Sequence, residues 1–182
     1  AVVAEAAGLG SGAVENRAPP GAKDGSAMRQ RTTKFSPNRK IVSEPPPEAD
    51  RIRLANEIGY GGNPEHKRHA GDFDLNPPAQ PRLGKTLCDD ANIHARAQAI
   101  ELLREGARRG LISVQAGAGG RFPKMIWAVT EGGVAMEAQI ENPEMGIYHG
   151  YPMPKHDPLE QEVHRLWIER APRDRSKRTL DL

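Results

Sequence analysis

The sequence predicts an α+β fold, in which a small antiparallel sheet packs against helices and a flexible N-terminal arm precedes the domain. Residues 48–111 are expected to form a helix, a loop and a second helix, consecutive strand-like segments follow, and an amphipathic helix comes last. Helices followed by a run of strands are typical of an α+β domain. Residues 1–45 are expected to be a linker or disordered basic arm, residues 46–171 a globular domain, and residues 172–182 a basic tail.

Composition and charge restrict the possible classes of function. The 182 residues suit one ordinary domain with extra chain, and 19 glycines with 16 prolines indicate that part of the chain does not pack. No apolar run approaches the roughly 18 residues that span a bilayer, and no signal peptide is evident, so we expect no membrane partner. A single cysteine, Cys88, excludes an internal disulfide and fits a reducing compartment.

Two helices are expected before the strands. The first runs through "EADRIRLANEI", where acidic residues suit the helix N-terminus and "GYGGNP" ends it. The second runs through "DDANIHARAQAIELLREGARRGLI", with Asp89 or Asp90 as a cap and Gly110 at its end. Gly106 weakens its interior by roughly 1 kcal/mol relative to Ala. Its apolar stripe comprises Ile93, Ala97, Ile100, Leu103, Ala107 and Leu111.

Strands are expected in "LISVQ", "MIWAVT", "VAMEAQI" and "GIYHGYP". The second and third flank "EGG", which is typical of a hairpin loop. In the third, Glu137, Gln139 and Glu141 alternate with apolar residues, which predicts a half-buried strand with one polar face.

The closing helix is expected in "PLEQEVHRLWIERA". Asp157 is its candidate N-cap, and Pro172 stops it. Its buried stripe comprises Leu159, Val163, Leu166 and Trp167.

The stretch "EHKRHAGDFDL", residues 65–75, crowds cations and histidines beside an Ala-Gly turn. One interpretation is a metal site formed by His66, His69 and Asp72, although no distant ligands complete it. A second is a solvated loop anchored by apolar Phe73 and Leu75. A third is phosphate chemistry, because histidine exchanges protons near neutral pH and adjacent Lys and Arg bind phosphate.

In the phosphate interpretation, the loop itself fixes the angle of the site. Gly71 is expected to let the backbone turn sharply after His69, and Phe73 is expected to hold the loop on the core. Asp72 is expected to bond nearby backbone or orient a side chain rather than act on substrate.

The segment "KRHAGDFDL" resembles the signature of the colicin D nuclease domain, within the barnase, EndoU, colicin and RelE-like ribonucleases. The shared core is "HAGDF", and the resemblance in element order covers about residues 65–152. It implies that the motif histidine and preceding lysines serve catalysis on a tRNA anticodon loop. Carried over, His69 matches the histidine, Arg68 stands where the family has Lys, His66 replaces the other lysine, and Lys67 is a neighbour that can substitute for it.

The resemblance also assigns substrate-binding positions on the later strand. The family's "SGW" appears here as "EAQ", so Glu137 and Gln139 occupy those positions and the Ser and Trp are absent. In "YHGYP", His149 is the candidate catalytic partner and Tyr148 a candidate base platform, because aromatic rings stack on unpaired bases. The alternative is that Tyr148 packs in the sheet and His149 faces water.

Basic residues lie on both sides of this site along the chain. Arg29 and Arg31 belong to "MRQRTTKFSPNRK", which has no acidic residue, and "RDRSKRTLDL" ends the chain. Each cation near a phosphate strengthens binding through counterion release. Arg29 and Arg31 are therefore expected to bind RNA.

These features favour a metal-independent ribonuclease toxin without a cofactor, which cleaves tRNA or another structured RNA by attack of the 2′-hydroxyl. An acidic immunity or antitoxin protein is its expected partner. The expected location is the cytoplasm of the producing or target bacterial cell, or secretion as part of a larger toxin. The alternative is a non-enzymatic RNA-binding or assembly protein that uses the basic arms. A cleft that gathers titratable groups favours the enzyme.

Overall fold

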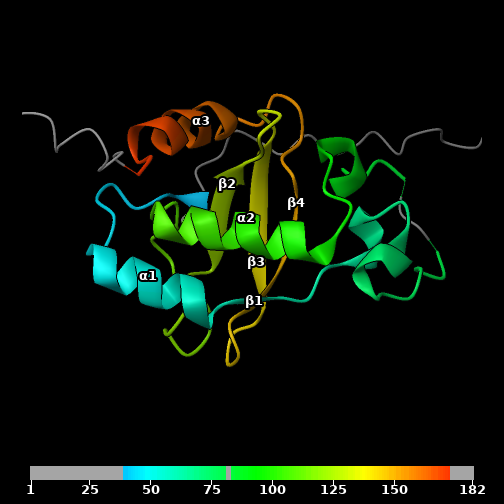
Figure 1. The fold of residues 1–182 in the computed structure, drawn as a ribbon, viewed down its shortest axis with the longest axis horizontal. Helices are drawn as coiled ribbons and strands as arrows, with labels where there is room; N and C mark the ends of the chain where they lie inside the picture. Colours follow the sequence, from blue (N-terminus) through cyan, green and yellow to red (C-terminus); the bar gives the residue numbers. More distant parts are fainter. Residues whose placement is uncertain (1–38, 81–82, 173–182) are drawn as a thin grey trace, which may run out of the picture.

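The computed structural model describes residues 39–80 and 83–172 (Figure 1). Within them, helices and a four-stranded sheet form an α+β fold, which confirms the predicted class. The elements are α1 (Glu48–Glu57), β1 (Gly59–Tyr60), η2 (Pro64–His66), η3 (Ala70–Phe73), η4 (Cys88–Ala91), α2 (Arg96–Arg108), β2 (Met125–Val129), β3 (Ala135–Asn142), β4 (Ile147–Pro152) and α3 (Glu160–Glu169), where η denotes a short 3₁₀ turn.

The sheet has the strand order β1-β4-β3-β2. The predicted hairpin of β2 and β3 is confirmed, and β4 continues the antiparallel run. However, β1 pairs with β4 in parallel, so the sheet is mixed rather than wholly antiparallel. The parallel pair is possible because the connection from β1 to β4 contains α2, which supplies the long crossover that parallel strands need.

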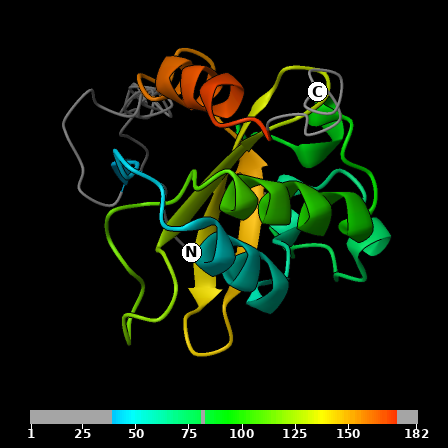
Figure 2. The same cartoon turned by 60° about the vertical axis from the view of Figure 1, so that its left-hand side comes forward.

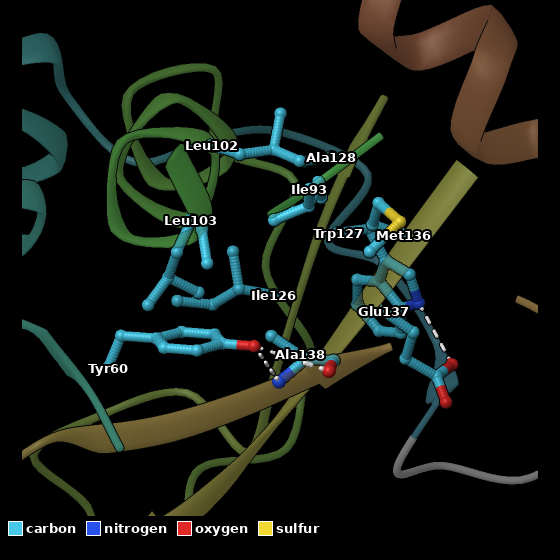
Figure 3. Close-up of a pocket in the computed structure, with 12 residues that line it drawn as sticks. Tyr60, Ile93, Leu102, Leu103, Ile126, Trp127, Ala128, Met136, Glu137 and Ala138 are labelled. Atoms are coloured by element: carbon cyan, nitrogen blue, oxygen red, sulfur yellow. Dashed lines mark hydrogen bonds between the residues drawn. The ribbon is translucent and has the colours of Figure 1, made fainter. Parts of the chain in front are cut away.

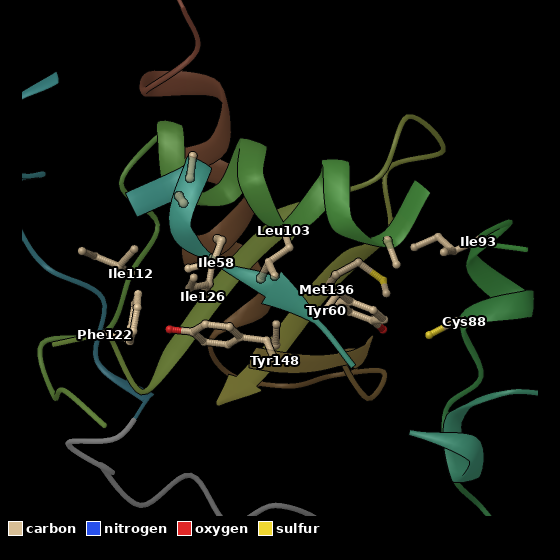
Figure 4. Close-up of a cluster of buried hydrophobic side chains, with 14 of the residues drawn as sticks. Ile58, Tyr60, Cys88, Ile93, Leu103, Ile112, Phe122, Ile126, Met136 and Tyr148 are labelled. Atoms are coloured by element: carbon tan, nitrogen blue, oxygen red, sulfur yellow. The ribbon is translucent and has the colours of Figure 1, made fainter. Parts of the chain in front are cut away.

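The two faces of the sheet are covered differently. Figures 1 and 2 show α1 and α2 side by side against the sheet, with α3 apart from them. The larger apolar core fills the space between α1, α2 and the sheet, and it contains Ile126, Met136 and Tyr148 (Figure 4). The smaller core lies beneath α3 and contains Trp127 and Val129, which point to the opposite face because strand residues alternate.

Helix α2 begins later than its sequence indicates. Asp89 and Asp90 were the predicted caps, yet the chain first forms η4 and then bends at Asn92, whose φ is 58°. The helix starts at Arg96, and the Gln98 side chain accepts hydrogen bonds from the backbone N–H groups of residues 94 and 95. The predicted end is confirmed, because Gly110 takes a left-handed φ of 68°.

Gly106 has a packing function in α2. A Cβ at this position would lie 2.3 Å from the carbonyl oxygen of Trp127 on β2, closer than any real Cβ contact. The glycine therefore lets the helix backbone approach the strand, and this close contact offsets its low helix propensity.

The structure differs in detail from two other predictions. The segment "LISVQ" forms isolated bridges, Ile41 with Ser113 and Ile112 with Ile126, rather than a full strand. Helix α3 begins at Glu160, and Asp157 accepts a hydrogen bond from the Leu159 N–H at 3.0 Å just before it. Val163 and Leu166 are buried as predicted.

The folded domain includes residues that were assigned to the arm. Ile41 is only 3% exposed and belongs to the core beneath α3. Arg39 forms ion pairs with Glu137 at 2.9 Å and Asp157 at 2.6 Å. The guanidinium of Arg170 also donates to the carbonyl oxygen of Val42 at 2.8 Å. The predicted boundary at residue 45 is therefore too late, because residues 39–42 already pack. Residues 1–38 and the tail from residue 173 lie outside the described part.

None of the helices in residues 39–80 and 83–172 has both the length and the apolar character required to cross a membrane.

Candidate active site

Polar side chains gather on the sheet face that carries α3, beyond the area that this helix covers. The register places Gln139 opposite His149 and Glu137 opposite Tyr151, so each directly opposed pair shares a face. Trp127, opposite Glu137, belongs to the core beneath α3, whereas Gln139 is exposed. The candidate site is therefore the outer end of this face.

A third ring reaches the same place from a distant part of the chain. Asn63 caps the turn η2 by accepting a hydrogen bond from the Glu65 N–H at 2.9 Å, and the turn carries His66 inward. The His66 ring stacks on Tyr151 with centroids 4.6 Å apart and an interplanar angle of 19°. It lies 6.4 Å from the His149 ring, again nearly parallel at 18°. The fold thus pairs two histidines that are 83 positions apart.

The proton positions on His66 follow from its partner. Its Nδ1 lies 2.7 Å from the carbonyl oxygen of Thr86. A carbonyl only accepts, so Nδ1 carries a proton, and Nε2 of the neutral ring is the basic nitrogen. Burial lowers the pKa of His66 below its usual value, against the opposing effect of the Thr86 carbonyl, and the nearby positive charge of Lys85 lowers it further.

His149 has a different environment. Its Nδ1 is buried and has no hydrogen-bond partner in the described part of the chain, but Glu141 Oε2 lies 3.9 Å away. Burial lowers the pKa of His149, the carboxylate of Glu141 opposes that shift, and Lys85 adds to it. Lys85 therefore acts electrostatically on both histidines.

Tyr151 is fixed by a buried network. Its hydroxyl donates to Glu137 Oε1 at 2.8 Å, while Glu137 Oε2 accepts from Trp127 Nε1 at 3.1 Å and from Arg39 Nε at 2.9 Å. Figure 3 shows the bond between Trp127 and Glu137. Glu137 is 0% exposed, so its predicted contact with substrate is wrong. Its carboxylate instead holds the tyrosine on which His66 stacks.

Lys67 was a candidate phosphate ligand, and the structure excludes that role. Its Nζ is buried and lies 3.1 Å from Asp89 Oδ1, 3.2 Å from the Ile93 carbonyl oxygen and 3.6 Å from Asp72 Oδ2. It also lies 4.5 Å from the centre of the Phe73 ring. These contacts occupy the ammonium group, so Lys67 stabilises the fold rather than binding phosphate.

The other motif residues remain at the surface. Arg68 is exposed and pairs with Asp90 at 2.7 Å. His69 is exposed at the start of η3, and in the described part of the chain its ring joins neither the hydrogen bonds nor the ring contacts of the His66–His149 pair. The structure therefore gives His149 a different partner from the one that the motif implies.

The loop turns by a different means from the one expected. Asp74, with φ of 57°, takes the left-handed conformation that was assigned to Gly71. A Cβ at Gly71 would meet nothing within 4 Å, so this position has no structural need for glycine. Phe73 is fully buried, as predicted.

The remaining predicted ligands divide between core, surface and undescribed chain. Tyr148 is 0% exposed and donates to the Pro123 carbonyl oxygen at 2.5 Å, and burial raises its pKa. It cannot offer its ring to a base, so that prediction is wrong. Gln139 does lie on the open face beside His149. Arg29 and Arg31 lie outside the described residues.

Two hollows in the described part of the chain are lined by neither His66 nor His149. The cavity between α2 and the sheet is about 30 Å³ and mostly apolar, which suits a single small molecule such as water (Figure 3). A hollow of about 420 Å³ lies between the start of α2 and the β2–β3 loop, away from either histidine of the pair. Among residues 39–80 and 83–172, no group of three or more His, Cys, Asp or Glu is arranged to hold a metal ion.

Sequence reasoning missed three contributors to this site: Lys85, Glu141 and Tyr151. The strand period could have revealed two of them, since Glu141 follows Gln139 by two positions and Tyr151 follows His149 by two. Lys85 has no such signal, because it lies in a loop that only the fold brings to the sheet.

No protein-family model, curated protein or solved structure matches the chain. The chemistry of the His66–His149 pair is therefore the ground for a proposal about function.

Proposed function

We propose that the protein is a metal-independent endoribonuclease that uses His66 and His149 as its acid–base pair. The supporting observation is the pair itself, two nearly parallel rings 6.4 Å apart at the open end of a sheet face. General acid–base catalysis needs one group to take a proton and another to give one, both within reach of the same phosphodiester. Two imidazole rings suit that requirement, because imidazole can both accept and donate a proton.

The reaction balances without a metal or added water. One histidine takes the proton of the 2′-hydroxyl, and O2′ attacks the phosphorus and forms the new P–O2′ bond. The P–O5′ bond breaks, and the second histidine gives its proton to the leaving O5′. The products are a 2′,3′-cyclic phosphate and a free 5′-hydroxyl.

Lys85 supplies the positive charge that this step requires. It is one-third exposed, and it lies 3.5 Å from Glu65 as well as close enough to lower the pKa of both histidines. A cation beside the scissile phosphate stabilises the charge that develops on its oxygens. This role replaces the one that the sequence assigned to Lys67.

The "HAGDF" segment supports tRNA or another structured RNA as the substrate, and a toxin as the biological context. Exposed Arg68 and His69 then belong to an RNA-binding edge rather than to the reaction centre. An acidic immunity protein that covers the site is the partner this proposal implies.

The test is cleavage of purified tRNA and of a structured control RNA by the full chain, with and without excess EDTA. Cleavage should persist in EDTA and leave 2′,3′-cyclic phosphate ends. His66→Ala and His149→Ala should each slow it by about 10²–10⁴-fold, the usual size of a lost proton-transfer group. His94→Ala, which removes an exposed histidine outside the site, is the matched control and should keep the activity.

Three results would contradict the proposal. Loss of activity in EDTA with recovery in zinc would replace it with a metal mechanism. Unchanged rates in both histidine variants would remove the acid–base pair. If the protein binds the RNA but does not cleave it, the result would favour the non-enzymatic RNA-binding alternative.

A further inference from the structure

The two histidines have unequal surroundings, and this difference bears on which proton each one moves. His66 donates Nδ1–H to a backbone carbonyl, whereas His149 directs Nδ1 toward a carboxylate. A carbonyl fixes a tautomer, but a carboxylate also stabilises the protonated ring, because its full negative charge faces the imidazolium.

We propose that His66 is the general base, that His149 is the general acid, and that Glu141 is the positioning residue that gives His149 this role. The inference rests on the proposed function and assigns its separate proton transfers. In the cleavage step, Nε2 of His66 receives the 2′-hydroxyl proton, and His149 gives a proton to the leaving O5′.

The assignment of His66 follows from its contact with Thr86. Because Nδ1 already holds a proton that the carbonyl accepts, only Nε2 can bind the proton that leaves the 2′-hydroxyl. Nε2 has no hydrogen-bond partner among the described residues, so it is the nitrogen that can accept a proton, and because His66 is only 4% exposed the substrate must reach it at the edge of the ring. Stacking on Tyr151 keeps the ring plane fixed while this happens.

The assignment of His149 follows from the charges around it. Glu141 lies on β3 at the register shift between Ile140 and Asn142, and its side chain is 51% exposed. Such a side chain has the freedom to close the 3.9 Å gap to Nδ1 once the ring is protonated. The other nitrogen then carries the proton that His149 donates to the leaving group.

A carboxylate also lies near His66, but it is already paired. Glu65 forms an ion pair with Lys85 at 3.5 Å, which reduces its effect on the histidine. In the described part of the chain, Glu141 pairs with His149 and with no Lys or Arg. The titratable groups around His149 are therefore Glu141, Lys85, the neutral His66 ring and Tyr151, whose ring centroid lies 6.0 Å away. Glu141 alone among them favours the protonated form.

The experiment compares two versions of a tRNA anticodon stem-loop, one natural and one with sulfur in place of O5′ at the scissile bond. A thiolate leaves without protonation, so the sulfur substrate does not need a general acid. His149→Ala should cleave the natural substrate about 10²–10⁴-fold more slowly than the parent. On the sulfur substrate its cleavage rate should be close to the parent's. His66→Ala should be slow on both.

Glu141→Gln isolates the positioning residue, since its exposed side chain is not part of the core. Its cleavage of the natural substrate should be slower than the parent's at neutral pH, because without the Glu141 charge a smaller share of His149 is protonated, and it should recover on the sulfur substrate. Its matched control is Glu144→Gln, an exposed carboxylate in the β3–β4 turn, which should behave like the parent. The pKa of His149, followed by NMR, should fall in Glu141→Gln and stay unchanged in Glu144→Gln.

Two results would overturn the inference. Recovery of His66→Ala rather than His149→Ala on the sulfur substrate would reverse the two roles. An unchanged pKa of His149 in Glu141→Gln would remove Glu141 from its role. If the parent cleaves neither substrate, the proposed function fails, and the NMR titration still decides separately whether Glu141 acts on His149.

Discussion

The ammonium group of Lys67 lies in the interior, where Asp89 and the Ile93 carbonyl surround it, while its neighbour Arg68 faces solvent. The two cations are adjacent in the sequence, and nothing local decides which one turns inward. Asp89, 22 positions later, decides it by bonding both the Lys67 side chain and the Arg68 backbone N–H. The sequence could thus locate the cluster of charges but not separate its structural cation from its exposed one.

Lys67→Ala is expected to lower the free energy of unfolding by about 3–5 kcal/mol, because it leaves the buried Asp89 carboxylate without its cation. Arg68→Ala, which breaks an exposed ion pair with Asp90, should change it by no more than about 1 kcal/mol. Urea denaturation of both variants measures the difference. Equal effects of the two substitutions would show that Lys67 does not depend on its buried partners.

His66 and His149 make stability depend on pH. Burial lowers the pKa of each below the usual 6.5, so folding favours the neutral rings. Their stabilising contribution is therefore complete above about pH 6.5 and is lost as the pH falls through the lowered values. The melting temperature of the parent should fall from pH 7 to pH 5, and the fall should be smaller in His66→Gln and in His149→Gln.

Exposed His94 provides the control for this measurement, since His94→Gln should retain the pH dependence of the parent. Activity gives a related readout. Because catalysis needs one of the paired rings protonated and the other neutral, the optimum of kcat/KM should lie below pH 6.5. An optimum above pH 7.5 would contradict the assignment of this pair.

At the scale of elements, the strands could be predicted because their signals are local. Alternating polarity and a glycine turn are enough to specify the hairpin of β2 and β3, and the same alternation places Glu137, Gln139 and Glu141 on one face. The start of α2 could not be predicted in this way, because Asp89 makes a long-range contact instead of capping a helix. The place of His66 in the site likewise depends on the packing of η2 against β4.

Gly106→Ala tests the contact between α2 and β2. Alanine is the better helix former by about 1 kcal/mol, but its Cβ would lie 2.3 Å from the Trp127 carbonyl oxygen. We expect a net destabilisation of about 1–3 kcal/mol from overpacking, measured by chemical denaturation. The control is Gly71→Ala, where a Cβ meets nothing within 4 Å and the stability should scarcely change. A stabilised Gly106→Ala would mean that the helix moves away from the strand without loss.

At the scale of the molecule, the sequence predicted the layers better than the limits of the domain. The apolar periods indicate most of the buried faces, since Leu103 and Ala107 of α2 are buried, as is the predicted stripe of α3 at Val163 and Leu166. In α2, however, the predicted Ala97 is exposed, and Ala99 is buried instead. Ile41 has no periodic neighbours in its polar surroundings, so its burial could not be anticipated. Its partners come from the far end of the chain, on β2 and α3.

Two truncated chains test the revised boundary, one that starts at residue 39 and one that starts at residue 44. The second lacks buried Ile41 and the ion pairs of Arg39 with Glu137 and Asp157. Loss of a buried aliphatic side chain alone is worth about 2–5 kcal/mol, so the chain starting at residue 44 should melt at a clearly lower temperature. Equal melting temperatures would restore the boundary predicted at residue 45.

The guanidinium of Arg170 binds the carbonyl oxygens of Val42 and Ser43 at 2.8 and 2.9 Å. Residues 42–43, near the start of the described domain, therefore lie beside Arg170, which follows the end of α3. Because these two segments are adjacent, we expect that the domain can be inserted into a surface loop of another protein with little change in that loop. For the same reason, we expect it to tolerate circular permutation. In an inserted domain of this kind, Arg170 would hold the two connecting segments together through its hydrogen bonds to the Val42 and Ser43 carbonyl oxygens.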